Sequence, residues 1–202
     1  MTSTIAIIVF DGFDEIDVFG PFEILSSAGF DVHLAALSPG RVTSMRGVEL
    51  SVPRPLEGGD GLVVPGGGWL NRAPAGAWGE AQRGELPHRL VELAPSVRWL
   101  ASVCSGGMLL ATAGLLQGRP ATTNRACFEE FRPLVGEVID ERVVDDGDRI
   151  TAGALFSGVD LGLWITKREL GTEAADRVSA GTEYARQGRV WQATNGVRQA
   201  SS

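Results

Sequence analysis

Residues 97–111 of this 202-residue chain read VRWLASVCSGGMLLA and contain the junction that decides the fold. The apolar run from Val97 to Val103 is typical of a strand that is covered on both faces of a parallel sheet. Cys104 and three small residues follow this run, and an apolar helical stretch comes next. Ligands bind at the carboxyl ends of the strands in open α/β sheets, so a cysteine at this junction is expected at a functional site.

Strand-like and helical segments alternate on both sides of this junction. The strand-like runs are residues 5–10, 32–37 and 61–64, and helical spacing occurs at residues 22–28, 81–93, 158–169 and 173–186. This alternation predicts an α/β fold with a mostly parallel central sheet and helices on both faces. Hairpins are expected at residues 42–52 and at the Asp146-Gly147 turn. We expect a single domain over residues 1–190 and a frayed tail at residues 191–202.

The composition narrows the choice of partners and of compartment. The chain has 18 basic and 25 acidic side chains, a formal net charge of −7, which argues against binding to nucleic-acid phosphates. No apolar run approaches the roughly 20 residues of a membrane helix and no signal-peptide pattern is seen, so we expect a cytoplasmic protein without a membrane partner. The two cysteines fit a reducing compartment, and no metal is expected because the two histidines share no metal-ligand spacing with them.

The two cysteines lie in different contexts. A free cysteine often serves as a small buried hydrophobe, and Cys127, in an expected helix at residues 125–131, fits that role. Cys104 differs because the N–H groups and dipole of the following helix are expected to lower the pKa of its thiol. Ser105-Gly106-Gly107 permits the tight backbone of a nucleophile elbow, although the serine-hydrolase pattern G-x-S-x-G is absent.

Two further segments allow both a functional and a structural interpretation. Gly66-Gly67-Gly68 matches neither common phosphate-binding glycine motif, so it is either a plain loop or a source of backbone N–H groups for an oxyanion hole. Asp14 and Glu15 fit the first turn of a helix whose early position is held by Pro21. By contrast, Asp17 or Glu23 could reach the edge of the sheet near the cysteine as a general acid or base.

An ordered set of motifs resembles the ThiJ/PfpI superfamily, whose members are relatives of class I glutamine amidotransferases. The motifs are Asp17-x-x-Gly20-Pro21-x-Glu23, Val64-Pro65-Gly66-Gly67, Ser102-Val103-Cys104-Ser105-Gly106, Ala121-Thr122-Thr123 and a late segment at residues 151–162. The resemblance covers most of residues 5–185. It implies a flavodoxin-like three-layer sandwich, a nucleophile elbow at Cys104 and a homodimer.

Within this superfamily the sequence is most similar to the isonitrile hydratases, which implies a lyase that acts on a small molecule without a cofactor. The catalytic and substrate-binding residues implied are Asp17, Cys104, Ser105, Gly67, Gly68 and Trp69. In this scheme protonated Asp17 is the acid, so its pKa must be raised by burial or by the adjacent thiolate. The glycine and Ser105 N–H groups stabilise negative charge, and Trp69 either lines the pocket or simply packs.

Two positions depart from the pattern of the relatives. Ser105 stands where we expect threonine, and Asn124 stands where protease-like and amidase-like relatives often carry histidine. A Cys-His dyad at that position is therefore impossible, which weakens a peptidase interpretation. Another cysteine-dependent hydrolase, a glyoxalase-type lyase with a carbonyl substrate, and a redox or ligand sensor remain alternatives.

Overall fold

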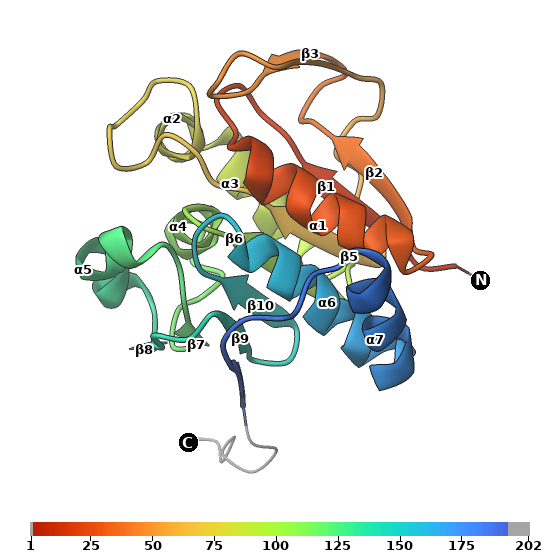
Figure 1. Cartoon of the computed structure of the whole chain (residues 1–202). Coiled ribbons are helices and arrows are strands. Elements are labelled where there is room, and N and C mark those ends of the chain that lie inside the picture. The colour runs from red at the N-terminus through yellow and green to blue at the C-terminus, as the bar shows by residue number, and fades with distance from the viewer. Residues whose placement is uncertain (1, 194–202) are drawn as a thin grey trace.

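The computed structural model describes residues 2–193, and a seven-stranded sheet forms its centre (Figure 1). The strands lie in the order β11-β9-β10-β6-β5-β1-β2, and every neighbouring pair is parallel except β9 and β10. The strand bounds are β1 (Thr4–Ile8), β2 (Asp31–Ala35), β5 (Gly61–Val64), β6 (Trp99–Val103), β9 (Val143–Asp145), β10 (Arg149–Ala152) and β11 (Val190–Gln192). The expected α/β class and mostly parallel sheet are confirmed.

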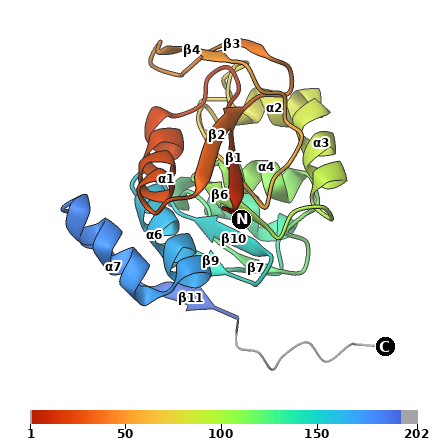
Figure 2. The same ribbon diagram turned by 90° about the vertical axis from the view of Figure 1, so that its right-hand side faces the viewer.

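Helices cover both faces of this sheet and make a three-layer sandwich (Figure 2). One outer layer contains α1 (Glu15–Ser27), α6 (Ser157–Leu170) and α7 (Thr172–Gly181), and the other contains α2 (Ala77–Arg83), α3 (Glu85–Leu93) and α4 (Gly106–Thr112). Smaller elements extend the edges: the hairpin β3 (Gly40–Thr43) and β4 (Glu49–Val52), the pair β7 (Pro120–Ala121) and β8 (Glu137–Val138), the short helix α5 (Phe128–Phe131), and the 3-10 turns η1 (Arg125–Cys127) and η2 (Arg132–Leu134).

The middle strands are apolar along their length because both of their faces are covered. Every residue of β5 and β6 is buried, as are residues 5–8 of β1. Burying one large aliphatic side chain of this kind contributes about 1.5–3 kcal/mol, so these three strands anchor the core. Their carboxyl ends point to one edge of the sheet, and the segments that follow them are the glycine loop after β5 and Cys104 after β6.

Three expected boundaries were wrong. Helix α1 begins at Glu15 rather than at Phe22, because Asp14 caps it by accepting the Ile16 N–H at 3.0 Å. Pro21 therefore lies inside the helix and not in its first turn. The helix expected at residues 81–93 is two helices, since Gly84 adopts a left-handed conformation with φ 79° between them.

The two expected hairpins are present in the structure, and part of the expected tail belongs to the sheet. The hairpins expected at residues 42–52 and at the Asp146-Gly147 turn are both present. Trp191 and Gln192, which we expected in a frayed tail, pair with β9 as part of β11, and the Ala193 N–H donates to the Asp145 carbonyl at 3.0 Å, so this part of the expectation was wrong. Residues 194–202 lie outside the described residues. Within residues 2–193, no helix combines the length and apolarity that a membrane crossing requires.

Candidate active site

Cys104 lies at the sharp turn between β6 and α4 and has a φ of 54°, a left-handed conformation that side chains rarely adopt. Its N–H is shared between the carbonyls of Ala152 at 3.1 Å and Gly153 at 2.8 Å. On the other side, the Thr123 hydroxyl donates to the Cys104 carbonyl at 2.7 Å. These bonds hold the strained turn from two neighbouring segments, the end of β10 and the loop after β7. The expected tight turn at Cys104 is therefore present, and the role of this cysteine as a nucleophile stays a prediction.

Asp17, in the first turn of α1, is fully buried. Its Oδ2 accepts the Gly66 N–H at 2.9 Å, and its Oδ1 has no partner in a conventional hydrogen bond among the described residues. Burial, reinforced by the charge of Asp14, raises the pKa of Asp17 to about 8, against lowering by the Gly66 N–H, the Cys104 thiol and the Leu155 N–H. The increase that an acid near neutral pH requires is thus present.

The Cys104 thiol does not have the low pKa that we expected from the helix terminus. Burial and the nearby Asp17 charge raise its pKa to about 12, and donors from Asn124, Ser105 and Leu155 only partly oppose this. The side chain is 7% exposed, and α4 has only seven residues. With pKa values of about 8 and about 12, both groups keep their protons at neutral pH, and the pair holds one proton between about pH 8 and pH 12. A thiolate beside a protonated carboxyl is one of the two arrangements of that single proton.

Ser105 connects the elbow to the glycine loop. Its buried hydroxyl accepts the Gly67 N–H at 3.0 Å, so this N–H, which we expected to be a free oxyanion donor, already has a partner. The Gly68 N–H has no acceptor within the described part of the chain. The roles of Gly67, Gly68 and Ser105 toward a reacting atom stay predictions.

Gly66 is required because the two motifs approach each other closely at this point. A Cβ on Gly66 would come within 2.5 Å of the Ser105 hydroxyl, 2.6 Å of the Ser105 nitrogen and 3.0 Å of Asp17 Oδ2. Any side chain would force these groups apart. The glycine therefore allows the acid, the loop and the elbow to meet.

Other residues that the sequence singled out lie in different surroundings. Trp69 is 7% exposed within the main core, and its indole N–H donates to Glu130 at 3.0 Å, so its role in lining a pocket stays a prediction. Glu23 is exposed and bonded to Ser27, so our expectation that it could reach Cys104 was wrong. Cys127 is buried, and burial raises the pKa of its thiol to about 11, consistent with a structural role.

Asn124 is a neighbour of the cysteine whose role the sequence left undefined. Its Nδ2 lies 3.5 Å from Cys104 Sγ. The only signal in the sequence was its position directly after the Ala121-Thr122-Thr123 motif, because a contact across 20 positions of the chain depends on the tertiary fold.

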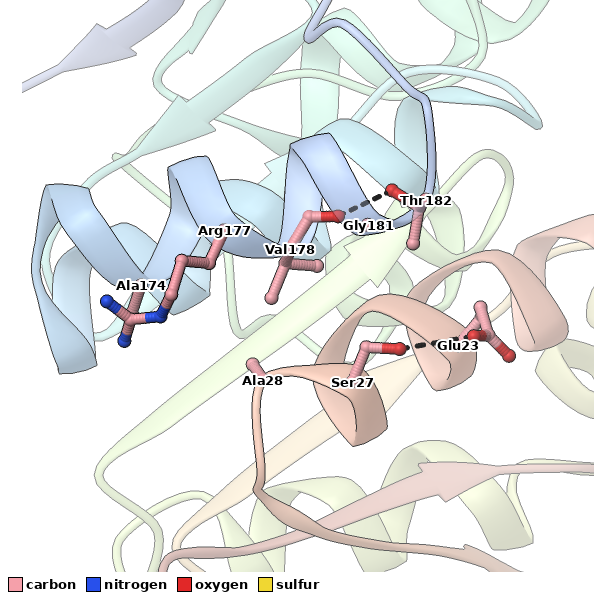
Figure 3. A pocket seen from close by; sticks show the side chains of 8 residues that line it. All are labelled: Glu23, Ser27, Ala28, Ala174, Arg177, Val178, Gly181 and Thr182. Atoms are coloured by element: carbon pink, nitrogen blue, oxygen red, sulfur yellow. Dashed lines mark hydrogen bonds between the residues drawn. The ribbon is translucent and has the colours of Figure 1, made fainter.

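Two surface cavities differ in their relation to this site. A cleft of about 420 Å³ is lined by residues 122–125, 140–142, 153–154, 157 and 187–188, and so includes Asn124 in its wall. A second groove of about 410 Å³ lies between the end of α1 and α7 (Figure 3). Two hydroxyls in that groove bond internally, Ser27 to Glu23 and Thr182 to the Val178 carbonyl. No cluster of three or more metal-ligating side chains occurs in residues 2–193.

Comparisons with known proteins find relatives over most of the chain. The DJ-1/PfpI family model matches residues 3–168. An isonitrile hydratase from Pseudomonas putida is 31% identical over 190 residues, which cover 92% of this chain and 80% of the relative. A deglycase from Thermococcus kodakarensis is 27% identical over 147 residues, 70% of this chain and 84% of that one.

Solved structures share the fold. A ThiJ/PfpI family protein from Pseudomonas syringae superposes with a TM-score of 0.82 at 26% identity, over 93% of this chain and 77% of that chain. Drosophila melanogaster DJ-1beta gives a TM-score of 0.79 at 23% identity, over 92% of this chain and all (100%) of that chain, and so supports the fold alone.

Proposed function

Because the chain belongs to the DJ-1/PfpI family, as its motifs predicted, we propose that it is an isonitrile hydratase, a lyase that adds water to an isonitrile to give an N-substituted formamide. The observation that carries this proposal is the buried pair of Asp17 and Cys104, whose raised pKa values leave one proton on the two groups above about pH 8. Such a pair can supply a nucleophile and an acid to the same place.

The substrate class follows from where the electrons and the proton must go. The terminal carbon of an isonitrile accepts both the nucleophile and the proton, whereas a carbonyl substrate takes the nucleophile on carbon and the proton on oxygen. A carboxyl group close enough to the sulfur to perturb its pKa suits the first pattern. An uncharged substrate also suits a site in which Cys104 is only 7% exposed, because such a substrate loses little hydration on entry.

In the first step the Cys104 thiolate forms a bond to the terminal carbon, and the Asp17 carboxyl gives its proton to that carbon. The product is a thioimidate in which the sulfur is joined to a CH=N group, and Asp17 is left as a carboxylate. The Gly66 N–H stabilises this carboxylate through the existing bond to Oδ2.

In the second step water adds to the same carbon, with its hydroxyl on carbon and its proton on nitrogen. In this scheme the Ser105 hydroxyl, which accepts the Gly67 N–H at 3.0 Å, positions this water. Loss of the hydroxyl proton to Asp17 forms the formamide carbonyl and expels the Cys104 thiolate. The pair then holds one proton again, so the cycle closes without a cofactor.

The family resemblance also supports a homodimer. Phe19 is 37% exposed and Met45 is 44% exposed, and both lie beside Phe13: the Phe19 ring meets its ring at 6.5 Å, and the Met45 N–H donates to its carbonyl at 2.9 Å. Two exposed apolar side chains so close together are a surface that a second copy could cover. Sedimentation equilibrium tests this expectation, and a monomer at all concentrations would contradict it.

The experiment that tests the function is incubation with cyclohexyl isocyanide, with the formamide measured by chromatography and methylglyoxal as the competing carbonyl substrate. Cys104→Ala is expected to abolish formamide production. Cys127→Ala is the matched control, since it removes the other buried thiol and is expected to keep the activity. A correctly folded protein that forms no formamide would rule out the hydratase, and turnover of methylglyoxal alone would favour a glyoxalase-type lyase.

A further inference from the structure

We propose that Asn124 is a catalytic residue of this site, and that its side-chain amide donates a hydrogen bond to the reacting sulfur of Cys104. This inference rests on the proposed role of Cys104 as the nucleophile. It assigns the task of stabilising the thiolate to a side chain that carries no charge.

The orientation of the amide is fixed by the local backbone. Asn124 is the N-cap of the 3-10 turn Arg125–Cys127, and its Oδ1 accepts the Ala126 N–H at 3.0 Å. Only an oxygen can accept this bond, so the Nδ2 end of the amide must point the other way. That end lies 3.5 Å from Cys104 Sγ, within the range for a bond to sulfur. The cap therefore aims the donor at the sulfur.

The surroundings of the sulfur explain why such a donor matters. Among the groups that perturb Cys104, the one ionisable side chain is Asp17, and its charge opposes formation of a thiolate. Of the donors that favour the thiolate, Ser105 and Leu155 act through their backbone, and Asn124 is the side chain. An imidazole here would compete with Asp17 for the shared proton, whereas an amide donates without titrating. The asparagine thus leaves the proton with the Asp17 and Cys104 pair.

Asn124 also forms part of the wall of the cleft of about 420 Å³. That volume falls in the range of about 300–1,000 Å³ that is usual for small-molecule sites. Thr123 and Gly153 line the same cleft and bond to the backbone of Cys104. A substrate in this cleft would therefore contact Asn124 and the residues that hold the Cys104 backbone.

Two substitutions remove the Nδ2 donor of Asn124 and keep an oxygen for the N-cap. Both Asn124→Asp and Asn124→Ser keep an oxygen that can cap the 3-10 turn, because aspartate and serine are as good as asparagine at this position. Both remove the N–H directed at the sulfur. Circular dichroism and the melting temperature show whether the fold is retained, so that a loss of reactivity can be assigned to the missing donor.

The readout is the pH dependence of the alkylation of Cys104 by iodoacetamide, followed by peptide mapping so that Cys127 is counted separately. Both variants are expected to shift the alkylation profile to higher pH and to slow Cys104 alkylation at a fixed pH by about 10- to 100-fold, the size expected for a hydrogen bond to a charged group. An unchanged profile in both folded variants would overturn the proposal, whatever the substrate of the enzyme.

This outcome is independent of the assay for isonitrile turnover. Slower alkylation in the variants without formamide production by the unaltered chain would support the Asn124 bond and reject the hydratase. Formamide production by the unaltered chain together with unchanged alkylation in the variants would support the hydratase and reject the Asn124 bond. A Cys104 that is never alkylated in the unaltered chain would overturn both proposals.

Discussion

The backbone N–H of Gly66 donates to the Asp17 carboxylate over 2.9 Å, and this bond ties the glycine loop after β5 to the first turn of α1. The two residues are 49 positions apart in the chain, yet both border the elbow of Cys104. The bond gives a fully buried carboxyl group one fixed donor, while its other oxygen is left for the chemistry. Burial outweighs the lowering of the Asp17 pKa by the Gly66 N–H, the Cys104 thiol and the Leu155 N–H, so it is the dominant influence on that pKa.

The raised pKa of Asp17 predicts how the stability of the protein depends on pH. The folded-state pKa of about 8 lies above the ordinary aspartate pKa of 3.8, so the folded state holds the proton more tightly and gains stability that is present at low pH. That gain is lost as the pH rises through about 8. Asp17→Asn, which cannot ionise, is expected to gain stability relative to the unaltered chain as the pH increases.

The measurement is the melting temperature of both proteins at about pH 5 and at about pH 9, on either side of the folded-state pKa. Asp31→Asn is the control, because it removes an exposed carboxylate and should leave the difference between the two pH values as it is in the unaltered chain. We expect the melting temperatures of Asp17→Asn and the unaltered chain to differ by more at one pH than at the other. If the two proteins differ in melting temperature by the same amount at both pH values, a buried carboxyl that titrates near pH 8 is contradicted.

The same pair predicts how turnover depends on pH. The proposed first step needs a protonated Asp17 beside the Cys104 thiolate, which is an arrangement with one proton on the pair, and the pair reaches its one-proton state as the pH rises through about 8. We expect kcat/KM for cyclohexyl isocyanide to rise up to that pH and then to level off. Asp17→Asn should lose about 100-fold or more in kcat, the range of general acid catalysis. Activity that keeps rising to pH 10 would show that a free thiolate is enough.

Much of the elbow could be predicted from the sequence because it is local. An apolar strand, one cysteine, two or three small residues and an apolar helix adjoin each other in residues 97–111, and no distant contact is needed to place Cys104 at the end of a strand. Asp17 could be identified only through a motif. The Asp14 cap explains why α1 starts earlier than its apolar spacing indicated, with Pro21 inside the helix.

What the sequence could not provide is how the site residues are paired across the fold. The donors to the sulfur include Asn124, and the Gly67 N–H is used by Ser105, although each of these pairs lies 20 or more positions apart. Local reasoning also gave the wrong direction for the pKa of Cys104. A helix terminus lowers the pKa of a cysteine, but here burial and a buried carboxylate, which depend on the packed core, have the larger effect.

Gly66→Ala is expected to be among the most damaging small substitutions in the chain. Its methyl group would lie 2.5–2.6 Å from the Ser105 hydroxyl and nitrogen, so the loop or the elbow must move. We expect a loss of about 1–3 kcal/mol of stability from overpacking and a large loss of kcat. Gly181→Ala, at the end of α7 with no atom within 4 Å of its Cβ, is the control and should be neutral or stabilising. Urea denaturation and turnover measure both effects, and a fully active Gly66→Ala would disprove the close approach.

Ser105→Ala and Ser102→Ala form a matched pair of serines on either side of the cysteine. The Ser105 hydroxyl accepts the buried Gly67 N–H at 3.0 Å, so its removal leaves that donor without a partner and is expected to cost about 1–3 kcal/mol of stability. The Ser102 hydroxyl is buried with no hydrogen-bond partner among the described residues, so its removal is expected to be neutral or stabilising. If Ser105 also positions the attacking water, its loss should slow hydrolysis of the thioimidate and let the covalent adduct accumulate. Mass spectrometry of the protein during turnover detects that adduct, and a Ser105→Ala protein with normal turnover and no adduct would limit this hydroxyl to a structural role.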